Sequence, residues 1–484
     1  MSRYKTSRYV ITAPLKDGRE LAYNGMSGAL AVWEPAEAQV FQDIAQGRET
    51  TDSRTAAELF YGGYLVTPET DELELLHGQY RLHRFNRRTL VLTVAPTLAC
   101  NFACDYCFQG QDKPIETMGQ TVQDAVVDFV LKLSHELNHV HIAWYGGEPL
   151  LRMNVIEALS DRFMAVCDER NIQYDAMAVT NGYRLTLAVA QTLVKKRVKT
   201  VQVTLDGNQV YHDSRRFLLS GGNTFDKIIK NLKEVVTHTP LKINIRVNID
   251  HRNSTGVFQL LDVLAAEGLA NQQNFRLYFA PIEAMTVGCH SVEGACMSKS
   301  DYGQLETRIY RYAFDKGLTG LPYPPRFHGS CGAIRPSSFI VIPSGDIHKC
   351  WDTVTYPQHA IGSIFDMDKA IRSEKTMRWL SWSPFNNDAC RNCKLLPNCA
   401  GACAYKFLHA DDTRGEAASL PCPSWKYNIK ERLLLRAEKS AAILPTDWDA
   451  EMVYTNPQEL CVDKVILKPQ DKEPSATTEV LEVT

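Results

Sequence analysis

Between residues 89 and 280 the chain repeats one unit, an apolar run of strand length followed by a segment with helical periodicity. A crossover helix returns the chain to the same edge of a sheet, so the strands that it joins run parallel. Six such units predict an α/β fold. They are two fewer than a closed eightfold barrel needs, so we expect a partial (β/α)6 barrel. The strand-like runs cover residues 90–94, 140–144, 176–180, 201–205, 243–249 and 275–279.

Helix signals lie between these runs. In residues 121–135 the apolar side chains recur every three or four positions and fall on one helical face. Residues 255–267 follow a capping residue, Asn253 or Ser254, and end at Gly268, which favours a helix stop. Both segments therefore predict helices that pack on the sheet.

Residues 1–88 predict a separate, small α+β domain. Asp17-Gly18 suits a hairpin turn between strands at 8–14 and 19–23. A further strand at 29–33 precedes a helix that ends near Ile44. A second helix near 55–60 leads to a strand at 64–67.

Size, charge and cysteine content narrow the class of protein. The 484 residues predict two to four domains, and a net charge of −3 gives no case for nucleic-acid binding. No apolar run reaches the ~18 residues of a membrane span, and the first 15 residues lack the core of a signal peptide. We therefore expect a cytoplasmic protein without membrane partners. In that reduced compartment its 14 cysteines indicate metal binding or catalysis more than disulfides.

Three cysteines follow the first strand-like run with the spacing C-x3-C-x2-C: Cys100, Cys104 and Cys107. Three thiolates leave one iron of a [4Fe-4S] cluster without a protein ligand, so a small molecule can bind there. The position fits as well, because ligands bind at the carboxyl ends of strands in such folds. A structural zinc site is the rival interpretation, but it needs a fourth ligand and none lies nearby in sequence.

The loop's Cys-x-Tyr-Cys-Phe ending resembles the radical S-adenosylmethionine (SAM) superfamily. Gly146-Gly147-Glu148-Pro149, after the second strand, is similar to that family's GGEP motif. The resemblance implies that Cys100, Cys104 and Cys107 are catalytic, and that this backbone and Glu148 bind the SAM amino group. It also implies further cofactor contacts: Tyr106 near the adenine; Asn181, Thr204 and Asp206 near the ribose and carboxylate; Arg246 near the carboxylate or a structural acid.

A second cysteine block resembles the SPASM domain, which holds two auxiliary [4Fe-4S] clusters. The block begins with Cys331, and a G-x4-C motif runs from Gly345 to Cys350. The pattern C-x2-C-x5-C-x3-C follows from Cys390 to Cys403, and Cys422 is the last cysteine of the block. The C-x2-C pair alone also suits zinc. The resemblance implies two ligand sets: Cys390, Cys393, Cys399 and Cys422 for the distal cluster, and Cys331, Cys350 and Cys403 for the nearer one.

The nearer set departs from the family pattern. Fully ligated relatives often have another cysteine about six residues earlier, where this chain has Pro325. The cluster then has an open iron, which suits a substrate thiolate, or it borrows Cys289 or Cys296. For Cys167 and Cys461 we expect the role of small buried hydrophobic residues.

The resemblance implies an enzyme that reductively cleaves SAM to a 5′-deoxyadenosyl radical, with electrons from a low-potential donor such as flavodoxin or ferredoxin. Domains are expected at 1–88, 89–320 (barrel), 321–430 (SPASM) and 431–484, the last with a helix at 427–444 and a disordered tail from 468. The N-terminal unit weakly resembles a winged-helix peptide-recognition element. We therefore expect a peptide or protein substrate and installation of a thioether or other side-chain crosslink. Formation of formylglycine in sulfatases and non-catalytic electron transfer are the alternatives.

Overall fold

The computed structural model describes residues 3–318, 325–449 and 452–461. The predicted tail from 468 lies outside these residues. No helix in the described part is long and apolar enough to cross a membrane.

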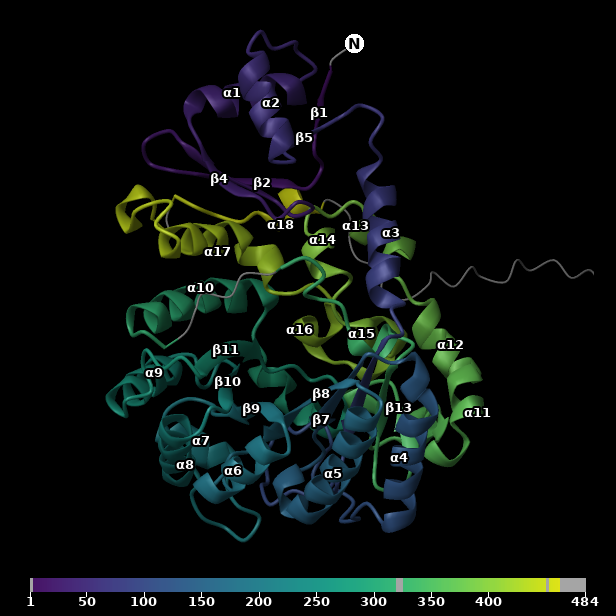
Figure 1. Cartoon of the computed structure of the whole chain (residues 1–484). Coiled ribbons are helices and arrows are strands. Elements are labelled where there is room, and N and C mark those ends of the chain that lie inside the picture. Colours follow the sequence, from purple (N-terminus) through teal and green to yellow (C-terminus); the bar gives the residue numbers. More distant parts are fainter. Residues whose placement is uncertain (1–2, 319–324, 450–451, 462–484) are drawn as a thin grey trace, which may run out of the picture.

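A nine-stranded sheet forms the centre of the molecule, with the order β11-β10-β9-β8-β7-β6-β12-β13-β14 (Figure 1). The six strands from β6 to β11 pair in parallel and in sequence order. The α/β expectation is therefore confirmed, with each predicted run inside or within one residue of a strand. These strands are β6 (Thr89–Val94), β7 (His139–Trp144), β8 (Gln173–Thr180), β9 (Val198–Thr204), β10 (Lys242–Ile249) and β11 (Phe275–Pro281).

The two faces of this sheet differ in polarity. Buried and half-buried residues alternate along β6, and Leu90 and Leu92 join one apolar core with Val126 and Val130. The other face carries half-buried polar side chains such as Arg246. Helices cover the apolar face: α4 (Gln120–Leu133), α5 (Met153–Glu169), α6 (Leu187–Lys195), α7 (Gln209–Arg215), α8 (Phe225–His238), α9 (Gly256–Ala266) and α10 (Lys299–Asp315).

The sheet extends beyond the six expected strands. β12 (Ser338–Val341) pairs in parallel with β6, and β13 (Asp346–His348) and β14 (Gly362–Ser363) continue it antiparallel. The start of the cysteine-rich segment is thus continuous with the parallel sheet, a long-range pairing that the sequence did not predict.

Short helices make up most of the remaining cysteine-rich segment, and the longer α17 (Trp425–Lys439) packs against α10 and against strands of the N-terminal unit (Figure 1). The others are α11 (Met367–Arg372), α12 (Glu374–Ser381), α13 (Asp388–Arg391), α14 (Leu396–Cys399), α15 (Ala404–Leu408), α16 (Gly415–Ser419) and α18 (Pro457–Leu460).

The N-terminal unit has its own small core, which contains Trp33, Val40 and Leu59. Its antiparallel sheet and its helices lie where the sequence predicts them. The elements are β1 (Lys5–Thr6), β2 (Val10–Pro14), β3 (Glu20–Asn24), β4 (Leu30–Trp33), α1 (Pro35–Ala45), α2 (Ser53–Tyr61) and β5 (Leu65–Val66).

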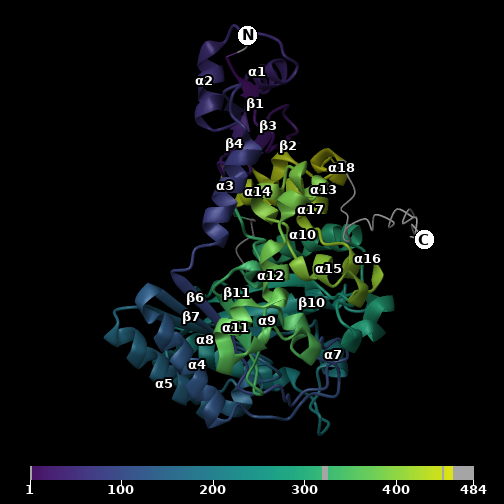
Figure 2. The same ribbon diagram turned by 90° about the vertical axis from the view of Figure 1, so that its right-hand side faces the viewer.

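The helix α3 (Glu72–Arg84), which the sequence analysis missed, leads from this unit toward the rest of the molecule (Figures 1 and 2). Its last residue, Arg84, is only 2% exposed. The guanidinium donates hydrogen bonds of 2.6–2.8 Å to the carbonyl oxygens of Ile334, Leu380 and Trp382. A fourth, longer bond of 3.4 Å reaches the Trp379 carbonyl oxygen, so the buried guanidinium fixes the end of α3 to the cysteine-rich segment.

Candidate active site

A cavity of about 440 Å³ opens at the carboxyl ends of the parallel strands. Loops after β6, β7 and β8 form one side of it, and residues that follow β11 and β13 form the other. The expected position of the site, at this edge of the sheet, therefore coincides with a real cavity.

The three cysteines of the first loop, Cys100, Cys104 and Cys107, all line this cavity. Burial raises the pKa of the Cys100 thiol to about 12 and that of the Cys104 thiol to about 11, so both are protonated without a bound cation. Bound iron would supply the positive charge that stabilises the thiolates. Three converging thiols at the mouth of a cavity fit a cluster with one open iron.

Gly146 and Gly147 let the loop after β7 approach the cysteine loop closely. A Cβ atom at either position would lie 2.2 Å from a carbonyl oxygen: that of Thr97 for Gly146, and those of Leu98 and Ala99 for Gly147. Gly146 also has a φ of +130°, which disfavours other residues. Both glycines line the cavity, and the close packing of the two loops requires glycine at both positions.

The Glu148 carboxylate is fully buried and accepts three hydrogen bonds. Its donors are the Leu150 amide (3.0 Å), the Thr180 hydroxyl (2.7 Å) and the Asn181 amide (2.7 Å). Burial raises the pKa of this carboxyl. Glu148 thus ties the end of β8 to the glycine loop, and it does not itself line the cavity.

Asn181, Thr204 and Arg246 line the cavity as the sequence predicts. The Asn181 amide group donates a 2.8 Å hydrogen bond to the Asn101 side chain inside the cysteine loop. Arg246 donates a 2.7 Å hydrogen bond to the Asn248 side chain. These polar groups come from three different strands and converge on one space.

Asp206 lies behind the cavity wall and is fully buried. Its carboxylate accepts a hydrogen bond from the Tyr106 hydroxyl and another, of 3.1 Å, from the Asn248 amide. Arg216, which lines the cavity, lies 3.8 Å from Asp206 and also donates to the Tyr106 hydroxyl. Asp206 and Arg216 therefore fix the Tyr106 hydroxyl, and with it the end of the cysteine loop.

The far wall of the cavity holds a carboxylate that the sequence analysis missed, Asp352. Burial raises its pKa to about 6, and its Oδ2 lies 3.6 Å from Sγ of Cys350. Within the described residues no basic side chain forms an ion pair with it, whereas Glu283 on the same wall pairs with Lys406 at 2.9 Å. The sequence signal that could have identified Asp352 is its position, two residues after Cys350 of the G-x4-C motif.

The later cysteines form two groups. The pKa of the Cys350 thiol lies well above its ordinary value, first because the thiol is buried and then because Asp352 is near. Cys331 and Cys403 raise it further, so these three cysteines are neighbours. This is the set that the resemblance assigns to the nearer cluster.

The other group contains the four cysteines of the second set. Burial raises the pKa of the Cys399 thiol, and Cys422 and Cys390 add to the rise. The pKa of Cys393 is raised first by a hydrogen bond with Cys461, then by burial and by Cys399. Cys461 is buried as expected, but it lies beside this group, with its Sγ 2.9 Å from the Ala389 carbonyl oxygen.

The two cysteines considered as additional ligands differ in position. Cys289 lines the cavity, but its Sγ contacts the Thr286 carbonyl oxygen at 3.3 Å in its own turn. Cys296 does not line the cavity, and its Sγ contacts the Val292 carbonyl oxygen at 3.4 Å. Cys167 is fully buried in the main core, as expected.

Comparison with known proteins agrees with this geometry. The radical SAM superfamily model matches residues 94–247. The radical SAM cyclopropyl synthase TigE of Paramaledivibacter caminithermalis is 21% identical over 82% of this chain and 89% of TigE. The serine-type anaerobic sulfatase-maturating enzyme of Klebsiella aerogenes is 21% identical over 65% of this chain and 80% of that enzyme.

Two solved structures share the fold. The structure of anSMEcpe with bound AdoMet has a TM-score of 0.56 and 18% identity, and covers 73% of this chain and 98% of its own. Streptococcus suis SuiB bound to its precursor peptide SuiA has a TM-score of 0.50 and 15% identity, with coverage of 84% and 97%.

Residues 94–247 thus match a radical SAM domain, and the relatives that align with most of the chain are radical SAM enzymes or maturases. The chain's similarity to sulfatase maturases and to SuiB supports a place in the SPASM subfamily. A radical SAM domain implies a [4Fe-4S] cluster and SAM as cofactors.

Proposed function

We propose that the chain is a peptide maturase that installs a thioether or another side-chain crosslink. One hydrogen atom of the peptide would go to the 5′-deoxyadenosyl radical, one proton to a base of the cavity, and the remaining electron to an auxiliary cluster. One observation carries the proposal: three convergent thiols, Cys100, Cys104 and Cys107, line a cavity of about 440 Å³ at the carboxyl ends of the parallel strands. A cavity of this volume is in the range that takes a drug-sized ligand.

The cavity residues fit the cofactor. When bound there, a [4Fe-4S] cluster supplies the electron that cleaves SAM to methionine and a 5′-deoxyadenosyl radical. Gly146 and Gly147 offer close backbone approach, Asn181 and Thr204 offer polar groups, and Arg246 offers a positive charge for a carboxylate. Tyr106 lines the cavity as well, and Glu148 and Asp206 support these groups from behind.

The two later cysteine groups fit two auxiliary clusters. Cys390, Cys393, Cys399 and Cys422 give one complete set of four thiolates, and Cys331, Cys350 and Cys403 give three of a second set. Because Asp352 lies beside Cys350 and faces the cavity, we propose it as the group that removes a proton from the substrate. An open iron in the three-cysteine set would suit a substrate thiolate.

A peptide substrate is favoured by the relatives and by the additional N-terminal unit. The solved neighbours include SuiB bound to its precursor peptide SuiA and anSMEcpe bound to the Kp18Cys peptide. The residues before β6 form a folded unit fixed to the body by Arg84, which suits peptide recognition. We propose that the protein acts in the cytoplasm and takes electrons from flavodoxin or ferredoxin.

Product analysis tests the proposal. Anaerobically reduced, cluster-loaded enzyme is incubated with SAM and with short cysteine-rich or aromatic-rich peptides encoded beside its gene. We expect 5′-deoxyadenosine and a peptide that is two mass units lighter with a new crosslink in its fragmentation pattern. Replacement of Cys100 by Ala should abolish both, whereas Cys167→Ala, a buried cysteine of the core, should not. An unmodified peptide despite abundant 5′-deoxyadenosine would refute the crosslinking function.

Formylglycine formation in sulfatases is the second candidate, favoured by the match to the Klebsiella enzyme over 65% of this chain. An aldehyde on a sulfatase peptide, detected with a hydrazide reagent, would select it over a crosslink. A non-catalytic electron-transfer protein would hold iron and cleave no SAM, and the same incubation tests this alternative.

A further inference from the structure

A different set of metal-binding side chains lies at the other end of the same strands. His139 and His141 are two residues apart on β7, so their side chains project from one face of the sheet. Asp175 on β8 lies opposite His141 in the parallel register. The glycine loop follows the carboxyl end of β7, five residues beyond His141, which corresponds to roughly 16 Å along an extended chain.

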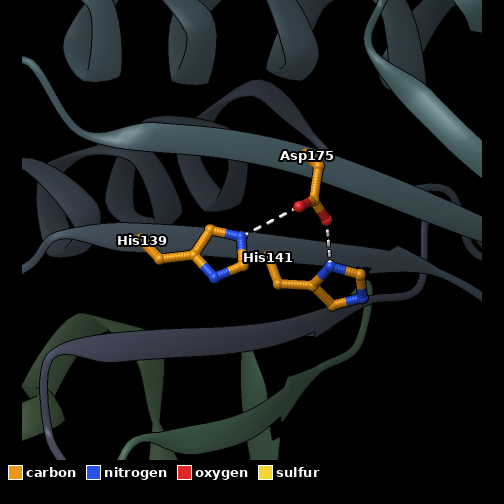
Figure 3. A group of neighbouring side chains, drawn as sticks. All are labelled: His139, His141 and Asp175. Atoms are coloured by element: carbon orange, nitrogen blue, oxygen red, sulfur yellow. Dashed lines mark hydrogen bonds and ion pairs between the residues drawn. The ribbon is translucent and has the colours of Figure 1, made fainter.

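Figure 3 shows both imidazoles directed at the two oxygens of one carboxylate. Nε2 of His139 lies 2.9 Å from Oδ2 of Asp175, and Nδ1 of His141 contacts Oδ1. One nitrogen of each ring and one carboxylate oxygen lie within 4.8 Å of one another. Three ligand atoms from two adjacent, paired strands are therefore already close to a common point.

The surroundings leave the charge of Asp175 available to a cation. Its ion-pair partners in the described part of the chain are these two histidines, and no lysine or arginine is among them. The histidine side chains are 26% and 27% exposed, so water can reach the group and complete a coordination shell.

We propose that His139, His141 and Asp175 bind one divalent transition-metal ion at a site separate from the iron–sulfur cysteines. Two imidazole nitrogens and one carboxylate oxygen, with water in the remaining positions, suit zinc or a similar ion. Magnesium and calcium prefer oxygen ligands alone. Each neutral imidazole would carry its proton on the ring nitrogen that faces away from Asp175, so that the facing nitrogen presents its lone pair to the metal.

Such an ion would cross-link β7 to β8 at the amino ends of the strands, away from the cavity. Binding to the folded state alone stabilises a protein in proportion to the logarithm of ligand concentration over the dissociation constant. The expected role is therefore stabilisation of the sheet.

Zinc is the probe for the test. Cluster-loaded enzyme is titrated anaerobically with zinc chloride and passed over a desalting column. Bound zinc is then counted by mass spectrometry, and its ligands are identified by zinc K-edge X-ray absorption. We expect one zinc ion per chain with nitrogen and oxygen neighbours and no sulfur. The X-ray signal distinguishes this site from zinc that occupies cysteine sites.

Variants localise the ion. His141→Gln and Asp175→Asn should each weaken zinc binding by at least about 10-fold, since even the loss of groups that only support metal ligands costs that much. His135→Gln, which removes an exposed histidine outside the group, is the matched control and should bind like wild type. Unchanged 5′-deoxyadenosine formation by the variants would show that they fold.

Three results would overturn the proposal: no zinc retained, zinc with sulfur neighbours only, or equal retention by wild type and Asp175→Asn. In each case the three side chains would be a hydrogen-bonded cluster without a metal.

Discussion

Gly147→Ala is the sharpest single test of the geometry around the cysteine loop. The new methyl group would lie 2.2 Å from the carbonyl oxygens of both Leu98 and Ala99. Non-bonded carbon contacts are favourable only near about 3.5 Å, so the two loops must separate by about 1 Å. A misplacement of that size in a reacting centre can cost about 100-fold in rate. We therefore expect SAM cleavage to fall by about 100-fold.

The assay is the initial rate of 5′-deoxyadenosine formation with dithionite as reductant, normalised to iron per chain. Gly78→Ala is the matched control, because a Cβ atom there meets nothing within 4 Å. Gly78 lies inside α3, where alanine should add up to about 1 kcal/mol of helix stability and leave the rate unchanged. A Gly147→Ala enzyme with full iron content and the wild-type rate would refute the view that loop-to-loop packing requires this glycine.

Three further predictions concern other parts of the molecule. Arg84→Met removes four hydrogen bonds from a buried guanidinium, each worth up to about 1.5–3 kcal/mol, so the N-terminal unit should lose at least about 2 kcal/mol of protection in hydrogen exchange; unchanged exchange would contradict this. Asp352→Asn should keep 5′-deoxyadenosine formation and lower peptide modification by about 100-fold, and equal loss of both activities would argue against a proton-transfer role. Anaerobic removal of iron should raise proteolytic cleavage between residues 331 and 422 more than between residues 89 and 320, because bound metal stabilises the cysteine-rich segment in place of a large apolar core. Equal cleavage of both segments would contradict this role of the metal.

The sequence predicted the parallel strands and the cavity edge because both follow from local patterns. The β–α alternation sets the direction of each strand, and direction places the loops at Cys100, Gly146 and Asn181 at one edge. The assignment of the later cysteines to two cluster sets stays a prediction.

Other features depend on contacts that no local pattern encodes. The pairing of β12 with β6 joins residues more than 240 positions apart. Glu148 was expected at the cofactor, yet its hydrogen bonds to Thr180 and the Asn181 amide depend on how two strand ends meet. Helix α3 buries Leu76 and Tyr80 but exposes Leu75 and Leu82, which blurs its apolar periodicity. The Asp71 cap was a signal for it.

The anchored helix α3 makes the N-terminal unit a fixed part of the enzyme. Its 13 residues span about 20 Å. A peptide bound to the N-terminal unit would need on the order of six extended residues to span the length of α3. The position of the target residue would then be set by its distance in sequence from the segment that binds the N-terminal unit. Shortening the peptide between these two points would move the reaction to a different side chain.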